Sequence, residues 1–165
     1  MPIFNPNTFE FISRSPAQTS RIGIRLGKLL LAEDLICLSG DLGAGKTTLV
    51  QGIAKGWGTI DLATSPTFVL INNYRRPGGL EMNHLDAYRL ENAIEAEELD
   101  IEYYLSRGPL LVEWAERISR ALPEENLWIS MFWQGEQQRR LVISPHGKRY
   151  QKLFDKLKDL TFKGF

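Results

Sequence analysis

The sequence predicts a three-layer α/β fold in which a mixed parallel and antiparallel sheet is flanked by helices. A glycine-rich segment, residues 40–45, stands between an apolar strand-like run and a helix-like run. Further along the chain, two pairs of strand-like segments are separated by short runs of turn residues, which is typical of antiparallel hairpins. Helical segments separate the remaining strands, and parallel strands require such crossovers. Together these observations favour one mixed sheet with helices on both faces.

The composition predicts one soluble domain over residues 1–165. Of the 165 residues, 43% are hydrophobic and 24% are charged, and the chain shows no internal repeat. The longest apolar runs are far shorter than the about 20 residues that a membrane-spanning helix needs. Residues 1–8 lack the basic and apolar regions of a secretory signal, and the single cysteine, Cys37, fits a reducing compartment. We therefore expect a cytoplasmic protein with no membrane partner.

Charge is balanced overall but unevenly distributed along the chain. The 20 Lys and Arg residues match 20 Asp and Glu residues, so a uniformly basic surface that grips nucleic acid is not expected, and we expect no DNA partner. Residues 91–136 carry eleven acidic residues against three Arg, whereas residues 139–165 carry eight basic residues against two Asp. Two interpretations stay open: solvated helix faces, or two surfaces for a charged macromolecular partner.

The first half of the chain is expected to form a helix, a strand and a second helix. Residues 19–32 place apolar side chains at helical spacing after a start signal at residues 15–19, and residues 35–38 form a short apolar run. A second helix is expected over residues 46–55, ended by Gly56 and Gly58.

The second half is expected to alternate hairpins with helices. Pro77 and the two following glycines predict a turn between two strand-like segments, and a polar stretch at residues 134–138 predicts another. The expected elements are strands at 67–74 and 80–88, an acidic helix at 91–105, a strand at 109–113, strands at 127–133 and 139–144, and a closing helix at 150–160.

The glycine-rich segment predicts a nucleotide site. Residues 40–47, Gly-Asp-Leu-Gly-Ala-Gly-Lys-Thr, match the pattern G-x-x-x-x-G-K-[ST] without a departure. Glycines let successive backbone amides surround a phosphate chain, and the helix that follows adds its positive dipole end. We expect Lys46 to reach the β- and γ-phosphates, Thr47 to bind Mg²⁺ and Thr48 to bond the α-phosphate. The expected phosphate-binding backbone belongs to Gly40, Asp41, Leu42, Gly43, Ala44 and Gly45.

Two carboxylates are candidates to complete the site. Glu113 ends an apolar strand-like run, where a second Mg²⁺ ligand is expected, and Asp86 ends another, from which a loop reaches the γ-phosphate. Either acid can orient water. The alternatives are a salt-bridged strand end for Glu113 and a turn cap for Asp86. Trp114 is either ordinary core or a residue near the nucleotide or a partner surface.

The absence of one motif narrows the range of nucleotides that the site is expected to bind. The chain has no Asn-Lys-x-Asp string that would read guanine, so ATP is favoured over GTP. Three functions stay open: an ATP hydrolase, a small-molecule kinase, and a non-catalytic module that senses ATP. The hydrolase needs an arginine near the γ-phosphate, supplied by a partner or in cis by Arg89, because such a residue contributes about 10³ to 10⁵ in rate.

Four motifs taken together resemble the TsaE (YjeE) family of bacterial ATPases. They are Gly-Asp-Leu-Gly-Ala-Gly-Lys-Thr-Thr at 40–48, Ser-Pro-Thr-Phe at 65–68, His-Leu-Asp-Ala-Tyr-Arg at 84–89 and Leu-Val-Glu-Trp at 111–114. The similarity covers residues 19–143. It implies a P-loop NTPase fold and a weak ATPase that is required to form threonylcarbamoyladenosine next to the anticodon of tRNAs reading codons that begin with A.

The resemblance also implies partners and residue roles. The family acts with a TsaB-like and TsaD-like pair that stimulates ATP hydrolysis, so tRNA is met indirectly. Carried over, Thr47 and Glu113 hold Mg²⁺, Lys46 holds phosphates, Asp86 acts in hydrolysis and Trp114 lies near the nucleotide. Residues 65–67 fall in a second switch-like segment, and Thr19 matches a family threonine near the base. The hairpin turn before Arg139 and Arg140 is a further candidate for contact with the base, whereas the segment after Ser144 matches no family motif.

Overall fold

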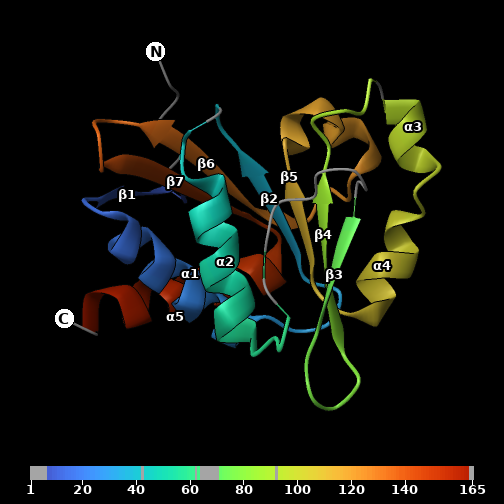
Figure 1. Cartoon of the computed structure of the whole chain (residues 1–165), viewed down its shortest axis with the longest axis horizontal. Helices are drawn as coiled ribbons and strands as arrows, with labels where there is room; N and C mark the ends of the chain where they lie inside the picture. Colours follow the sequence, from blue (N-terminus) through green and yellow to red (C-terminus); the bar gives the residue numbers. More distant parts are fainter. Residues whose placement is uncertain (1–6, 42, 62, 64–70, 92, 164–165) are drawn as a thin grey trace.

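Seven strands form one mixed sheet in the part of the chain that the structure describes, which is residues 7–41, 43–61, 63, 71–91 and 93–163 (Figure 1). The structure is a computed structural model. The strand order is β1-β7-β6-β2-β5-β4-β3. The strands are β1 (Phe9–Ser13), β2 (Leu35–Ser39), β3 (Ile71–Arg75), β4 (Glu81–Asp86), β5 (Leu110–Glu113), β6 (Asn126–Trp133) and β7 (Arg139–His146).

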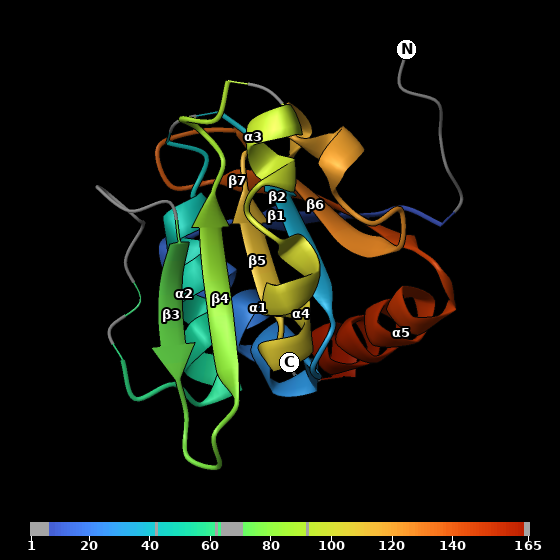
Figure 2. The same cartoon turned by 90° about the vertical axis from the view of Figure 1, so that its right-hand side faces the viewer.

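Helices flank the sheet on both faces. Those on one face are α1 (Pro16–Leu29), α2 (Lys46–Trp57) and α5 (Lys148–Lys163), and those on the other are α3 (Ala93–Glu97) and α4 (Ile101–Arg107) with the 3₁₀ turns η1 (Ala115–Arg117) and η2 (Ser119–Ala121). Figure 2 shows α2 and α4 on opposite sides of strands β4 and β5. The predicted α/β fold with a mixed sheet between helices is therefore confirmed.

The centre of the sheet is parallel and its edges are antiparallel. Strands β6, β2, β5 and β4 run parallel to one another, whereas β7, β1 and β3 pair antiparallel with their neighbours. Both predicted hairpins, β3–β4 and β6–β7, are present. Because β2, β4 and β5 are parallel, their carboxyl ends meet at one edge of the sheet, where ligands bind in open α/β folds.

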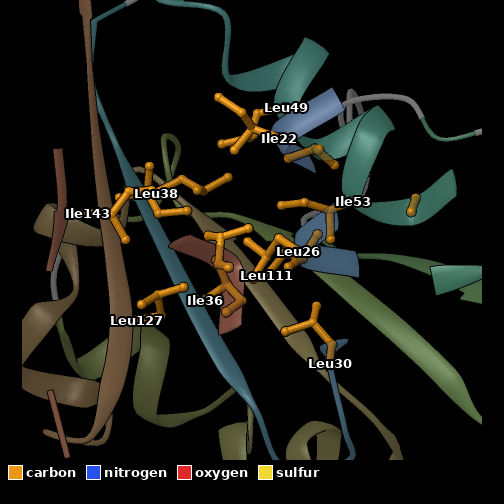
Figure 3. Close-up of a cluster of buried hydrophobic side chains, with 14 of the residues drawn as sticks. Ile22, Leu26, Leu30, Ile36, Leu38, Leu49, Ile53, Leu111, Leu127 and Ile143 are labelled. Atoms are coloured by element: carbon orange, nitrogen blue, oxygen red, sulfur yellow. The ribbon is translucent and has the colours of Figure 1, made fainter. Parts of the chain in front are cut away.

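The larger apolar core lies between the sheet and helices α1, α2 and α5. Alternate residues of β2 point to opposite faces, so Ile36 and Leu38 belong to this core while Leu35 and Cys37 belong to the second core beneath α3 and α4. In Figure 3, side chains from α1 and α2 such as Leu26 and Ile53 face the strand side chains. Fully burying one such side chain contributes about 1.5 to 3 kcal/mol.

Helices α1 and α2 pack through glycines at unusually close range. A Cβ added at Gly27 would lie 2.1 Å from the carbonyl oxygen of Ile53, and one added at Gly56 would lie 2.0 Å from that of Ile24. Gly56 therefore does not end the helix, as the sequence suggested. It lies inside α2, and Gly58, in the left-handed conformation at φ 96°, ends that helix.

Several predicted boundaries were wrong. Helix α1 starts three residues earlier than expected, because Pro16 takes its first position and the Ser15 side chain accepts a hydrogen bond from the backbone amide of Gln18. The acidic segment 91–105 forms two short helices instead of one, since Asp100 adopts φ 52° and caps α4. The sequence did not predict β1. The first part of the strand expected at 67–74 lies outside the described residues.

Among the described residues, no helix combines the length and the apolar content that crossing a membrane requires.

Candidate functional site

The glycine-rich loop links the end of β2 to the start of α2, and its backbone conformation requires glycine. Gly40, Gly43 and Gly45 all have positive φ, at 142°, 80° and 94°. At Gly40 space is limiting as well, because an added Cβ would lie 2.4 Å from the carbonyl oxygen of Met131. Three positions of the loop therefore carry no side chain, and the loop leads directly into the amino end of α2, a place in a helix that favours an anion.

A cleft of about 410 Å³ opens at this edge of the sheet. In Figure 1 the edge lies at the top, where β2 and β4 end and α2 begins. Residues from four separate parts of the chain line the cleft: Gly43, Ala44, Gly45, Lys46, Thr47, Thr48, Asp86, Glu113, Trp114 and Arg139. The loop and both candidate carboxylates, which are far apart in sequence, therefore share one cavity.

Lys46 is the first residue of α2 and is only 6% exposed. Its ammonium group donates to the carbonyl oxygens of Gly40 and, at 3.4 Å, of Asp41, and it lies 3.7 Å from the centroid of the Trp114 ring. Burial lowers the pKa of Lys46, and the nearby carboxylates, Glu113 first among them, act in the opposite direction. A partly desolvated cation beside the loop amides suits an anionic ligand.

The two carboxylates end neighbouring parallel strands. Asp86 on β4 pairs in register with Glu113 on β5. Glu113 is 3% exposed, and its Oε2 lies 2.8 Å from His84 Nε2, whereas Asp86 accepts a hydrogen bond at Oδ1 from the amide of Tyr88 at 2.9 Å. Burial raises the pKa of Asp86, and the negative charge of Glu113 raises it further. Asp86 thus caps a turn, which was the alternative left open for it, and Glu113 ends its strand bonded to a histidine, while both acids also line the cleft.

Trp114 follows Glu113 directly and closes one side of the cleft. Its backbone lies in the left-handed region, at φ 57°, which costs a residue other than glycine of order 1 to 3 kcal/mol. The ring stands over Lys46 on one side and contacts the Tyr88 ring, with centroids 5.0 Å apart. Trp114 also packs against the second apolar core, so it is both a core residue and a residue of the cleft, and its contact with a nucleotide stays a prediction.

Arg139 also lines the cleft, at its loop end. The Nη1 group donates to the carbonyl oxygens of Gly135 and Gln138, both at 2.8 Å, which fixes the guanidinium to the β6–β7 turn. A Cβ added at Gly45 would lie 3.6 Å from Arg139 Cγ. The sequence singled out the turn before this arginine, and only the strand register places the side chain itself beside the loop. Arg89 is exposed and does not line the cleft among the described residues.

Most predicted site residues meet in the cleft, and a few do not. Gly40 and Asp41 contribute carbonyl oxygens that hold Lys46. Thr19 is not among the residues that line the cleft; it is 1% exposed, and its hydroxyl forms a 2.7 Å hydrogen bond with that of Ser13. Leu42 and the predicted switch-like residues 65–67 lie outside the described residues.

The cleft has the donor set that a magnesium ion bound with a phosphate chain requires. Mg²⁺ takes oxygen ligands, and in phosphate sites it keeps several waters and binds one or two protein groups besides the substrate phosphates. A hydroxyl, on Thr47, and a carboxylate, on Glu113, line the same cleft. Within the described ranges no group of three or more His, Cys, Asp or Glu side chains forms a metal cluster. The residues therefore fit an ion that arrives with phosphates.

Comparison with known proteins identifies relatives over most of the chain. The family model for "Threonylcarbamoyl adenosine biosynthesis protein TsaE" matches residues 13–141. The tRNA threonylcarbamoyladenosine biosynthesis protein TsaE of Bacillus subtilis is 38% identical over 143 residues, covering 87% of this chain and 89% of the relative. The protein of the same name from Streptomyces coelicolor is 46% identical over 135 residues, covering 78% and 91%.

A solved structure is similar over nearly the whole length. The crystal structure of YdiB from Bacillus subtilis superposes with a TM-score of 0.76 at 32% sequence identity, covering 92% of this chain and 94% of that one. The matched family region contains the loop, Asp86, Glu113 and Arg139.

Proposed function

The chain belongs to the TsaE family of threonylcarbamoyl adenosine biosynthesis proteins, and from that premise we propose that residues 1–165 form one cytoplasmic P-loop ATPase domain that depends on Mg²⁺. In this proposal the domain works with a TsaB-like and TsaD-like pair in threonylcarbamoyl modification of tRNA, meets tRNA only through that complex, and hydrolyses ATP weakly alone. The observation that carries the proposal is the shared cleft of the glycine-rich loop with Asp86 and Glu113.

The residues of the loop bind the phosphates. The amides of the loop and the amino end of α2 supply hydrogen-bond donors, and Lys46 supplies a cation that exchanges its carbonyl partners for phosphate oxygens. Thr48 lies one residue further into α2 and bonds the phosphate nearest the nucleoside. Thr47 and Glu113 hold Mg²⁺, which neutralises charge on the β- and γ-phosphate oxygens when bound.

Asp86 orients the attacking water. Its Oδ1 is held by the amide of Tyr88, so its Oδ2 accepts a hydrogen bond from water. The raised pKa of Asp86 makes this carboxylate a better proton acceptor than an ordinary surface aspartate. Trp114 covers one side of the cleft and excludes bulk water from the phosphates.

Partner stimulation follows from the cations at the site. Lys46 and Arg139 line the cleft at its loop end, and Arg89 lies outside it. An arginine placed at the γ-phosphate contributes about 10³ to 10⁵ in rate. A domain whose own Arg139 is tied to the β6–β7 turn by two carbonyls is expected to hydrolyse slowly until a partner supplies or rearranges such a group.

Counting modified tRNA tests the proposal. The number of threonylcarbamoyladenosines formed per TsaB-like and TsaD-like complex is measured without this protein, with the wild type and with Glu113→Gln. We expect many rounds with the wild type and about one or none with Glu113→Gln. Glu124→Gln removes the same charge at an exposed position before β6 and is expected to match the wild type. Equal turnover with Glu113→Gln and wild type would contradict a role for hydrolysis.

A further inference from the structure

A continuous hydrogen-bonded chain of three buried side chains leads from the edge of the sheet to the cleft. The Tyr74 hydroxyl lies 2.9 Å from His84 Nδ1, and His84 Nε2 lies 2.8 Å from Glu113 Oε2. The three residues come from β3, β4 and β5, and they are 2%, 0% and 3% exposed. Buried polar side chains in such a chain are fixed in position, because breaking one bond leaves a desolvated group without a partner.

The strand register explains why these side chains meet below the cleft. Side chains two apart on a strand share a face, so His84 lies on the same face of β4 as Asp86, and Asp86 pairs with Glu113. Strand β3 lies on the other side of β4, and its Tyr74 pairs with Met82 of β4. The side chain of Met82 lies on the same face of β4 as that of His84. The chain thus lies in the layer between the sheet and α2, directly beneath the residues that line the cleft.

The direction of the hydrogen bonds follows from the groups involved. An ionised carboxylate only accepts hydrogen bonds, so His84 donates from Nε2 to Glu113. The other nitrogen of a neutral imidazole then accepts, and the Tyr74 hydroxyl donates to Nδ1. Tyr74 therefore selects the tautomer that donates to Glu113, and His84 engages one of the two carboxylate oxygens while Glu113 lines the cleft.

We propose that His84 and Tyr74 are positioning residues that orient the Glu113 carboxylate for Mg²⁺. This inference rests on the proposed ATPase function, and it assigns the β3–β4 hairpin a part in setting the Mg²⁺ requirement of the reaction. Partners that orient metal ligands typically contribute about 10-fold to 100-fold in metal affinity or activity. A histidine that only filled the core would affect stability and leave the Mg²⁺ requirement unchanged.

The test measures how phosphate release at saturating ATP depends on Mg²⁺ concentration. In His84→Leu, which removes the donor to Glu113, the half-saturating Mg²⁺ concentration is expected to rise about tenfold or more. In Tyr74→Phe, which removes one oxygen and leaves the ring, a smaller rise of about threefold is expected, since the direct donor remains. In His84→Gln, whose amide restores an N–H donor near the position of Nε2, the requirement returns toward that of the wild type.

Two controls separate a positioning role from a change in core packing or in ATP binding. Met82→Leu changes the core packing on the same face of β4 with nearly equal volume and is expected to keep the wild-type Mg²⁺ requirement. Binding of a fluorescent ATP analogue without Mg²⁺ is expected to be unchanged in Tyr74→Phe. A wild-type Mg²⁺ requirement in both His84→Leu and Tyr74→Phe overturns the inference, and Tyr74→Phe alone decides if His84→Leu does not fold. Absence of Mg²⁺-dependent phosphate release from the wild type overturns the proposed function itself.

Discussion

At the scale of single residues, the cleft gives two similar acids different environments. Glu113 is almost fully buried and bonded to a histidine, whereas Asp86 is half-buried and bonded to a backbone amide. Environment, more than residue type, sets the role of a carboxylate. We therefore expect substitutions of the two acids to have different effects. Substituting Glu113 should change the Mg²⁺ requirement, whereas substituting Asp86 should slow the chemical step.

Asp86→Asn is expected to lower phosphate release about 100-fold or more while ATP binding stays within about twofold, because a positioned base contributes about 10² to 10⁴ in rate. The wild type should also lose activity on acidification, since protonated Asp86 no longer accepts a hydrogen bond from water. Burial raises the pKa of Asp86 above the ordinary value of 3.8, so this loss is expected at higher pH than for an exposed aspartate. A pH profile of phosphate release that is the same in wild type and Asp86→Asn would contradict this role.

Arg139→Ala is expected to weaken ATP binding about tenfold or more. While Nη1 stays bonded to the turn, the buried Nε has no hydrogen-bond partner among the described residues and can donate to the nucleotide, and a hydrogen bond to a charged group contributes about 1.5 to 3 kcal/mol. The neighbouring Arg140 supplies a matched control. Adjacent strand residues face opposite sides of the sheet, and the Arg140 guanidinium lies over the Phe132 ring, 4.3 Å from its centroid. Titration of each variant with ATP measures the difference, and equal weakening by Arg140→Ala would show a general charge effect instead.

At the scale of elements, the position of α2 depends on its contact with α1. The residues proposed to bind phosphates, Lys46, Thr47 and Thr48, form the first turn of α2, so a shift of this helix moves the cleft. The glycines at the α1–α2 contact let the two backbones approach to a distance that no larger side chain permits. These glycines do not line the cleft, but they determine the position of α2 and therefore the position of the cleft residues in its first turn.

Gly56→Ala tests this contact. In an open helix, alanine is more stable than glycine by about 1 kcal/mol. At Gly56 the new methyl group meets the carbonyl oxygen of Ile24, so we expect a destabilisation of about 1 to 3 kcal/mol from overpacking. Denaturant unfolding measures whether the free energy of unfolding of Gly56→Ala is lower or higher than that of the wild type. The control Lys55→Ala, at the preceding exposed position of α2, is expected to change little, and a stabilised Gly56→Ala would contradict the tight contact.

Sequence patterns predict those parts of the site that are formed by residues close together in the sequence. The strand, loop and helix around residues 35–57 and both hairpins were foreseen, because their signals lie within short windows. The break at Asp100 has a local signal as well, an acid directly before the apolar Ile101, but the acidic run obscured it. Edge strand β1 was missed, since it is short and its partner β7 lies over 120 residues away.

Strand register decides what the sequence could not show. His84 is fully buried, and its hydrogen bonds to Tyr74 and Glu113 join three strands. Arg139 likewise reaches the cleft only because β7 lies beside β6 with its turn folded toward the loop. No spacing within one motif encodes a contact between residues that separate elements bring together.

At the scale of the whole molecule, ligand binding and folding are linked. A ligand that binds only the folded chain stabilises it by about 2.7 kcal/mol at a concentration of 100 times its dissociation constant. We expect Mg-ATP to raise the thermal unfolding midpoint of the wild type accordingly, and the same concentration to raise that of Lys46→Ala much less, because the cation in the cleft is gone. Equal shifts in both proteins would place the bound nucleotide elsewhere.

Phosphate release from Mg-ATP shows whether this cleft hydrolyses ATP under the control of partners. Purified wild type and Glu113→Gln are each measured alone and with the TsaB-like and TsaD-like proteins. We expect slow release by the wild type alone, a large increase with the partners, and loss of that increase in Glu113→Gln. ATP binding without phosphate release in any mixture would contradict this expectation, and would leave a nucleotide-sensing domain in which Asp86 and Glu113 do no chemistry.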